Sequence, residues 1–501
     1  MNIRWVFIKN AAASLGRAGT AGIVALLLPP LLVRHMTATD YGTWVLVLQC
    51  ASYVAYLDFG LQTAIGRYFA YATEKQDFEQ RNAIFTTAFV ALVAVALLSV
   101  TLLLVVVASI RFIFPSIPIA NIPAMQWSLL ILGISLALGL PASAWSGIFV
   151  GLQRYDIPAL AIGGGRLLSA LGVVIVVLLG HSIVTMAAIT ALVNLASYFV
   201  LYLAKRHIAP DVDFRMSLVR SSTTRELASY CFGLTVMSFS MLLITGLDVI
   251  LVARFQFSAV IPYSVSASLV VFLSGGATAV LNVIMPHAAA LHAQQSRRRL
   301  GRLLIICTQA TVVLLIFAGL PMMVYAAPLL TVWIGHQYVQ AGQPILVILL
   351  IGNMVRIIGV PYAVTIIATG QQRITMVSPL TEGICNFVAS LILGSMLGAI
   401  GVALGTLFGG CIGIAAQLFY SMPRTNREIE CSRRRYVGCG ILTPCLAAAP
   451  LLTVAGISLT GMLPLASHIS VFIPAIGISA LASMLLVKRT RIVATDSNAV
   501  A

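Results

Sequence analysis

The stretch from Tyr41 to Arg67, YGTWVLVLQCASYVAYLDFGLQTAIGR, constrains the fold more than any other. It is long and apolar enough to cross a bilayer as a helix, which takes about 20 residues. Asp58 nevertheless lies well inside it. A carboxylate in hydrocarbon costs ~2.5–3.5 kcal/mol or more, so it must face protein or water. The stretch therefore predicts a membrane protein whose helices surround something polar.

The rest of the chain repeats this pattern. Of its 501 residues, 60% are hydrophobic and only 9% are charged, whereas an ordinary globular domain is roughly one quarter charged. Long unbroken apolar runs exclude a transmembrane β-barrel, whose segments alternate over ~10 residues. We therefore expect an all-α, polytopic membrane protein with about fourteen transmembrane helices. They are expected near residues 11–34, 41–66, 83–110, 125–150, 158–180, 183–204, 227–253, 258–285, 302–325, 343–368, 375–396, 400–420, 436–459 and 465–487.

The basic residues form short clusters between the apolar segments, as the positive-inside rule describes. With the N-terminus inside, alternate loops hold 24 Lys and Arg residues, and the opposite loops hold 3, namely Arg34, Arg111 and Arg254. The formal net charge of +16 therefore reflects topology and does not indicate nucleic-acid binding. This asymmetry predicts that both termini are cytoplasmic.

The longest link between apolar segments, residues 205–226, separates two halves of six predicted helices each. We expect an N-terminal bundle over 1–204, a cytoplasmic linker over 205–226, a C-terminal bundle over 227–420 and two additional helices within 436–487. Asp211-Val212-Asp213 in the linker is similar to the metal-binding DxD of sugar transferases. Because no nucleotide-binding domain surrounds it, we interpret it as a solvated loop.

Glycine and proline predict features within the helices. One glycine per turn lies on a single face of the twelfth segment, which predicts close packing with a neighbouring helix. These glycines are Gly401, Gly405, Gly409 and Gly413. Prolines inside predicted helices should kink them. These prolines are Pro29, Pro30, Pro141, Pro321 and Pro361.

Six ionisable residues fall within predicted crossings. They are Arg17, Asp58, Arg166, Asp248, Arg356 and Glu382. Arg17, Arg166 and Glu382 lie close enough to the inner interface to snorkel towards it or to form structural ion pairs, and this alternative stays open. Asp58 and Arg356 favour a polar cavity, because each has a polar neighbour expected on its own helix face. Gln62 follows Asp58 by one turn, and Asn353 precedes Arg356 by three residues.

A cavity lined by arginines suits a multiply anionic ligand, because guanidinium pairs with phosphate in a bidentate manner. Carboxylates in the same helices suit ion coupling, because binding of H+ or Na+ changes the cost of burying them. The candidate substrate-binding residues are Arg17, Arg166, Arg356 and Asn353. The candidate ion-coupling or cavity carboxylates are Asp58, Asp248 and Glu382.

Motifs of catalysis are absent from the sequence. It contains no GxxxxGK[ST], HExxH or GxSxG, and its eight cysteines are scattered without paired spacing. An integral-membrane glycan polymerase or ligase would need a sizeable outer loop, and none is predicted. We therefore expect no enzymatic activity, no cofactor and no metal site, with H+ or Na+ as a coupling ion.

Several short motifs resemble those of a known family. They are LLLPPLLVRHM at 26–36, Asp40-Tyr41-Gly42-Thr43-Trp44, Tyr56-Leu57-Asp58-Phe59-Gly60-Leu61 with Arg67, Gly151-Leu152-Gln153-Arg154-Tyr155-Asp156, Trp333-Ile334-Gly335 and Gly398-Ala399-Ile400-Gly401-Val402-Ala403. With them the chain resembles, over most of its length, the polysaccharide exporters and O-antigen flippases of the multidrug/oligosaccharidyl-lipid/polysaccharide superfamily.

This resemblance implies two six-helix bundles around a central cavity, plus two appended helices. It implies a transporter of the bacterial inner membrane that flips a polyprenyl-pyrophosphate-linked oligosaccharide to the outer leaflet by ion-coupled alternating access. The product would serve O-antigen, lipopolysaccharide or exopolysaccharide biosynthesis. The implied partners are the lipid-linked substrate, the bilayer, a polysaccharide polymerase and a chain-length regulator, and no nucleic acid. A lipid II flippase and a multidrug or ion antiporter of the same superfamily stay open as alternatives.

Overall fold

The computed structural model describes residues 22, 24–282, 284–459, 471 and 473–482. Every regular element in this part of the chain is a helix, which confirms the all-α membrane fold. In it, 11 helices are long and apolar enough to cross a membrane, or 12 if the bent pair Arg433–Ala447 and Ala449–Ser458 is one span. The shorter apolar helices Val24–His35 and Ile473–Ala482 fall in the first and last predicted segments. The remainder of those segments lies outside the described residues, so the total of fourteen stays a prediction.

The chain divides into two compact units, Met1–Val265 and Ser266–Ala501. The boundary falls within α11 (Val260–Asn282). Helices α9 (Ser221–Met241) and α10 (Asp248–Phe255) therefore pack with the first unit, where they contact α2, α3 and α4. The domain boundaries drawn from the sequence stay a prediction.

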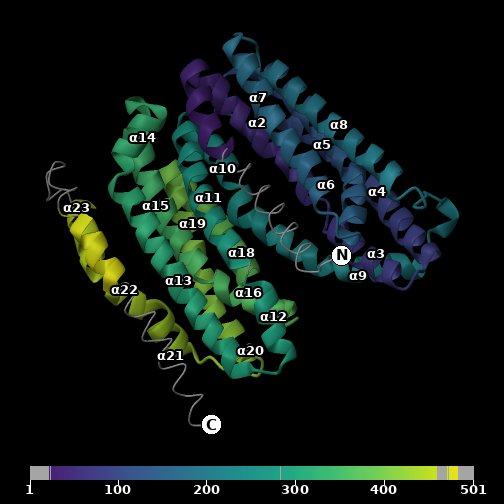
Figure 1. Cartoon of the computed structure of the whole chain (residues 1–501). Helices are drawn as coiled ribbons and strands as arrows, with labels where there is room; N and C mark the ends of the chain where they lie inside the picture. The colour runs from purple at the N-terminus through teal and green to yellow at the C-terminus, as the bar shows by residue number, and fades with distance from the viewer. Residues whose placement is uncertain (1–21, 23, 283, 460–470, 472, 483–501) are drawn as a thin grey trace. The chain divides into compact units, whose positions relative to one another are not determined.

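The first unit is a bundle of long helices, drawn from purple to teal in Figure 1. It contains Val24–His35, α2 (Ala38–Tyr56), α3 (Leu61–Glu74), α4 (Phe78–Ile113), α5 (Ile122–Gly151), α6 (Asp156–Pro158), α7 (Gly164–Leu178) and α8 (Ile183–Ile208), besides α9 and α10. Helix α5 is central and packs against α2, α3, α4 and α8, while α7 covers α8. Ile65, Phe69 and Leu92 are fully buried in its core.

The second unit has more and shorter helices. After α11 it contains α12 (Met285–Ala293), α13 (Arg297–Val324), α14 (Ala326–Ile334), α15 (Val339–Ile358), α16 (Val360–Ala368), α17 (Gln372–Thr375), α18 (Val377–Leu397), α19 (Ala399–Ala416), α20 (Met422–Thr425), α21 (Arg433–Arg435), α22 (Thr443–Ala447) and α23 (Ala449–Leu459). Helices α18 and α19 form a tight hairpin, and α15 also packs against α19. Two π-helical turns, η7 (Gln417–Ser421) and η8 (Tyr436–Leu442), interrupt the later spans.

The prolines act as expected in one case and are accommodated in others. Pro141 and Pro321 remain inside the continuous helices α5 and α13. Pro361 is the second residue of α16, directly after the turn at Gly359 that ends α15. Because proline has no backbone N–H, it is tolerated in the first turn of a helix. The sequence predicted a kink at this proline, and the structure has a break between two helices there.

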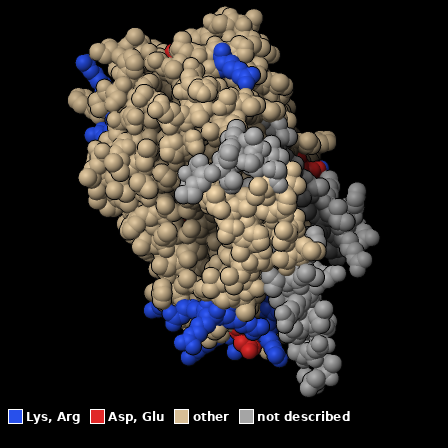
Figure 2. Space-filling view, turned by 90° about the vertical axis from the view of Figure 1, so that its left-hand side faces the viewer, with Lys and Arg blue, Asp and Glu red and all other residues tan. Residues whose placement is uncertain are grey.

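Basic side chains gather at one end of the face shown in Figure 2. In the second unit, α13 begins at Arg297 and α21 consists of Arg433–Arg435. These two helix starts lie at the same end, because the adjacent Leu300 and Tyr436 share one buried cluster. This grouping is the pattern that the positive-inside rule gives for a cytoplasmic end. The cytoplasmic position of this end and of the termini stays a prediction.

The linker of residues 205–226 is docked on the start of α4. Arg81 pairs with Asp211, and the Asn82 side chain donates to the Asp211 carbonyl at 3.3 Å. The same amide accepts a hydrogen bond from the Asp213 backbone N–H at 3.1 Å, and Val212 between them is fully buried. Asp211 and Asp213 lie in a loop and are exposed, as predicted for this tripeptide, whereas Val212 between them is buried.

Candidate functional site

Asp58 lies in a turn and not within a continuous helix. Helix α2 ends at Tyr56, residues 57–60 form the turn, and α3 begins at Leu61. Its last two residues, Phe59 and Gly60, have positive φ angles of 51° and 75°, a region that is unstrained only for glycine. The prediction that Asp58 and Gln62 share one face of an unbroken helix is therefore wrong.

The Asp58 carboxylate is held by two donors. The Ser143 hydroxyl of α5 donates to it at 3.2 Å, and the backbone N–H of Gln62 also donates to it. The second contact satisfies one of the unpaired N–H groups at the start of α3. Asp58 thus stabilises the helix break, and its charge is placed where α2, α3 and α5 meet.

A second broken helix lies against the first within the same unit. Helix α9 continues into a π-helical turn, η4 (Leu242–Gly246), and α10 begins two residues later at Asp248. The Gly246 carbonyl accepts hydrogen bonds from Gln49 Nε2 at 2.8 Å and from the Tyr53 hydroxyl, both on α2. Sequence reasoning missed Gln49 and Tyr53, although two polar residues four positions apart in an apolar helix are a detectable signal.

Asp248 is buried at the start of α10. It lies close enough to Tyr53 for the two groups to interact electrostatically. At the first residue of a helix, a carboxylate is favoured by the helix dipole. Asp58 and Asp248 therefore each accompany one of the two helix breaks in the first unit.

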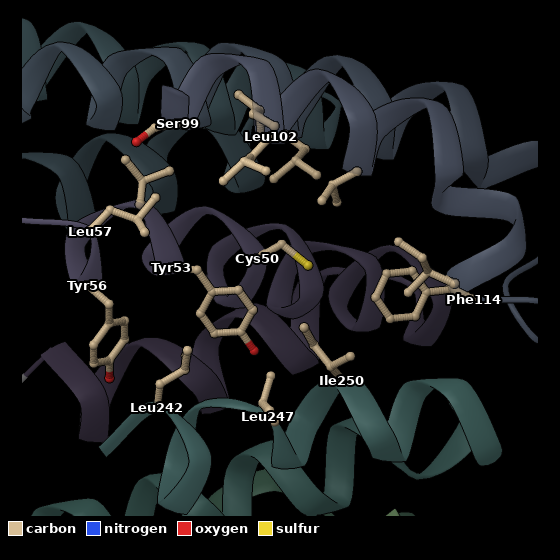
Figure 3. A pocket seen from close by; sticks show the side chains of 15 residues that line it. Cys50, Tyr53, Tyr56, Leu57, Ser99, Leu102, Phe114, Leu242, Leu247 and Ile250 are labelled. Atoms are coloured by element: carbon tan, nitrogen blue, oxygen red, sulfur yellow. The ribbon is translucent and has the colours of Figure 1, made fainter. Parts of the chain in front are cut away.

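An apolar cavity of about 300 Å³ lies between these two broken helices and α4. Figure 3 shows Cys50, Tyr53 and Tyr56 of α2 on one side and Leu242 and Leu247 on another. The predicted cavity was polar and lined by arginines, whereas this one is lined mainly by hydrocarbon side chains with isolated hydroxyl and thiol groups. It is a different site from the predicted one, and it was not foreseen because its walls come from four helices far apart in sequence.

Three of the predicted residues come together in the second unit. Arg356 on α15 donates to the Asn353 side chain, and Asn353 Nδ2 donates to the Leu349 carbonyl at 3.0 Å. Glu382 on α18 is buried and interacts electrostatically with Arg356. The expected polar pair of Asn353 and Arg356 on one helix face is therefore present, and a carboxylate accompanies it.

The glycine face of α19 explains how Glu382 approaches so closely. A Cβ atom placed on Gly413 would lie 2.5 Å from Glu382 Oε2, and one on Gly409 would lie 2.6 Å from Asn386 Cβ. A Cβ on Gly405 would meet the backbone of Ser390. The predicted close packing of this face is confirmed, and its partner is α18.

Two further candidates remain, Arg166 and Arg17. Arg166 is the third residue of α7 in the first unit, and its side chain is exposed. Arg17 lies outside the described residues. Within the described part of the chain, no three His, Cys, Asp or Glu side chains form a group that could hold a metal ion.

The chain matches one family by sequence. The family of polysaccharide biosynthesis proteins matches residues 7–292, which is more than half of the chain. The chain belongs to this family. A search of curated protein sequences found no match.

Solved structures of other proteins share the fold of this polysaccharide biosynthesis family member. The lipid II flippase MurJ in an inward closed conformation has a TM-score of 0.69 and 14% identity, with 96% of this chain and 98% of that chain covered. An inward-facing MATE multidrug transporter of the MOP superfamily has a TM-score of 0.64 and 13% identity, with 81% and 99% covered. A MOP transporter from Pyrococcus furiosus with reversed pocket polarity has a TM-score of 0.61 and 13% identity, with 84% and 96% covered. The fold is therefore that of the MOP transporters.

Proposed function

We propose that this protein flips a polyprenyl-pyrophosphate-linked oligosaccharide from the cytoplasmic to the outer leaflet for cell-surface polysaccharide synthesis. The observation that carries the proposal is that a member of the polysaccharide biosynthesis family has the fold of membrane transporters. A glycan made on a cytoplasmic lipid must cross the bilayer, and its hydroxyl groups need a polar path. The O-antigen and exopolysaccharide pathways are the proposed destinations.

Within this proposal, Arg356 binds the pyrophosphate, and Asn353 fixes the direction of its guanidinium group. Arg17 and Arg166 are proposed to add positive charge along the path. Glu382 competes with the anionic ligand for Arg356, so its protonation would release the arginine for binding. Asp58 and Asp248 are proposed as further groups through which H+ or Na+ drives alternating access.

The proposed setting is the bacterial inner membrane, with both termini in the cytoplasm. The carrier lipid and the bilayer are the direct partners. A polymerase and a chain-length regulator are proposed to receive the flipped unit. The protein acts by moving its substrate without changing any covalent bond, and needs no cofactor beyond the coupling ion.

A lipid II flippase is the second candidate. It is favoured by the similarity to MurJ along 96% of this chain. Both lipids carry a pyrophosphate, so the cationic groups suit either one. A multidrug exporter is less favoured, because cationic drugs suit an acidic cavity and Arg356 adds the opposite charge.

The test is the amount and sidedness of polyprenyl-pyrophosphate oligosaccharide in cells that lack this protein. We expect it to accumulate on the cytoplasmic face and to return to normal when the gene is restored. Mass spectrometry of the accumulated lipid identifies the glycan and separates a polysaccharide repeat unit from lipid II. Unchanged lipid-linked sugars with altered drug sensitivity would replace the proposal with drug export.

A further inference from the structure

The apolar cavity of the first unit has features that the flipping of a polar headgroup does not require. Its α4 wall includes Ser99, Leu103 and Val106, and its opposite walls include Cys50 of α2 and Ile250 of α10. Apart from isolated hydroxyl and thiol groups, the lining is hydrocarbon (Figure 3). Water in such a cavity would lack the two to four polar partners that it needs. The apolar lining therefore favours an apolar ligand.

The cavity is elongated along α4. Its lining extends from Ser99 to Phe114 at the end of that helix. The fifteen residue steps from 99 to 114 correspond to about 22 Å at a helical rise of 1.5 Å per residue. A compact ligand would leave much of this length empty, whereas a hydrocarbon chain lying parallel to α4 would follow it.

The volume of the cavity corresponds to part of a single hydrocarbon chain. An engineered apolar cavity of about 150 Å³ holds benzene, which has six carbon atoms. The volume here is about 300 Å³, so it accommodates roughly a dozen carbon atoms, or two to three isoprene units. Two chains side by side would not fit.

The cavity is reached from the lipid-facing side of the unit. Leu102 lines the cavity and is also 46% exposed, and the adjacent Leu104 and Val105 are 52% and 59% exposed. Exposed apolar side chains on a membrane-spanning helix contact lipid tails. A chain can therefore enter beside Leu102 without crossing water.

We propose that this cavity binds the distal part of the single isoprenoid tail of the transported carrier lipid. The assignment of the tail to the carrier rests on the proposed flippase function. A bilayer phospholipid has two chains joined at one glycerol, so seating one chain here would separate it from the other. A carrier lipid has one long branched chain, which can enter by its free end.

The position of the cavity links tail binding to the two broken helices. Tyr56 and Leu57 line it at the break after α2, and Leu242 and Leu247 line it at the break before α10. The same two helices are joined by the hydrogen bonds to the Gly246 carbonyl. A bound tail would thus contact both breaks.

The experiment uses the full-length protein in membrane vesicles and a polyprenyl phosphate with a photoreactive diazirine on its terminal isoprene. After illumination, mass spectrometry locates the crosslinked peptide. We expect crosslinks in residues 99–106 of α4, and we expect unlabelled polyprenyl phosphate to compete. Dioleoyl phosphatidate, which has the same phosphate but two acyl chains, should not compete.

Two variants fill the cavity from different points, Ser99→Phe and Val106→Phe. Each should lower the crosslink yield at least about fourfold, since every CH2 group kept out of the cavity forfeits about that factor in affinity. Leu104→Phe, on the exposed side of the same helix, is the matched control and should retain the yield. The use of two variants guards against one that fails to fold.

Crosslinks found only outside the cavity, or a yield unchanged in both filled variants, would overturn the proposal. Equal competition by phosphatidate would overturn the assignment to the carrier tail. A protein that still flips its substrate in cells but gives no cavity crosslink refutes tail binding alone. If cells lacking the protein show unchanged lipid-linked sugars, the proposed function fails regardless of the crosslink.

Discussion

The hairpin of α18 and α19 allows a sharp test of the packing argument through Gly405→Ala. The added methyl carbon would lie 2.5 Å from the backbone nitrogen of Ser390 and 2.6 Å from its Cα. Non-bonded carbon atoms have an optimal separation of ~3.5–4.0 Å, so the two helices must move apart by about 1 Å. A rotamer change cannot relieve contacts with backbone atoms. Overpacking of this kind typically costs about 1–3 kcal/mol, which raises the unfolded fraction at least about fivefold.

The measurement is SDS-driven unfolding from mild-detergent micelles, followed by circular dichroism. Gly276→Ala on α11 is the matched control, because a Cβ there meets nothing within 4 Å. Alanine also has the better helix propensity by up to ~1 kcal/mol. We expect the control to unfold at the wild-type detergent concentration or above it. If Gly405→Ala unfolds together with the control, the close approach of these helices is not as described and the reasoning fails.

Three further predictions concern the polar contacts. Arg81→Gln should release the docked linker and speed its cleavage by proteinase K several-fold. The control Arg215→Gln, which disturbs only an exposed 4.0 Å ion pair, should leave the cleavage rate unchanged. Equal cleavage rates in the two variants would show that Arg81 does not hold the linker on α4. Tyr53→Phe removes one of two donors to a buried carbonyl and should lower the free energy of unfolding by about 1 kcal/mol; no change in an SDS titration would mean that the bond contributes nothing. Asp58→Asn and Arg356→Ala should each reduce flipping of lipid-linked oligosaccharide at normal protein levels, and unaffected transport in both would refute their assignment to the transport path.

Features set by local spacing were predictable from the sequence. The glycines of α19 recur every four residues, so their common face follows from helix geometry alone. The turn before Pro361 follows from the missing N–H of proline. The paired placement of Asn353 and Arg356 also depends only on residues within one helical turn. In each case the decisive interaction lies within one helix or follows from its period.

Features that depend on distant residues were not predictable. The turn at 57–60 contains no proline, and its carboxylate is held by Ser143, 85 positions away in sequence. The Gly246 carbonyl finds its donors 193 and 197 positions away. Likewise, the buried position of Val212 depends on the linker folding back onto α4. A single sequence does not show which distant residues come into contact. The glycine of Asp58-Phe59-Gly60 was nevertheless a local signal for a turn.

The helix breaks help to separate structural polar residues from functional ones. Within a membrane, a carbonyl freed at a break must find a donor in the protein. Gln49 and Tyr53 supply it for Gly246, and the Tyr436 hydroxyl supplies it for Ile358 at 2.8 Å. All of these donors are neutral, so a break does not require a charge.

The electrostatic interaction of Arg356 with Glu382 therefore has no explanation in backbone satisfaction. Burying two opposite charges seldom stabilises a fold more than apolar side chains of similar volume would. Glu382 also requires a glycine opposite it, since a Cβ on Gly413 would collide with its carboxylate. A fold that accommodates a carboxylate in this way, next to an arginine that could bind phosphate, keeps two charges whose separation can depend on ligand and on pH. This is the property that the proposed ion-coupled flipping of an anionic lipid requires, and within that proposal it makes these two residues stronger functional candidates than the carboxylates at the breaks.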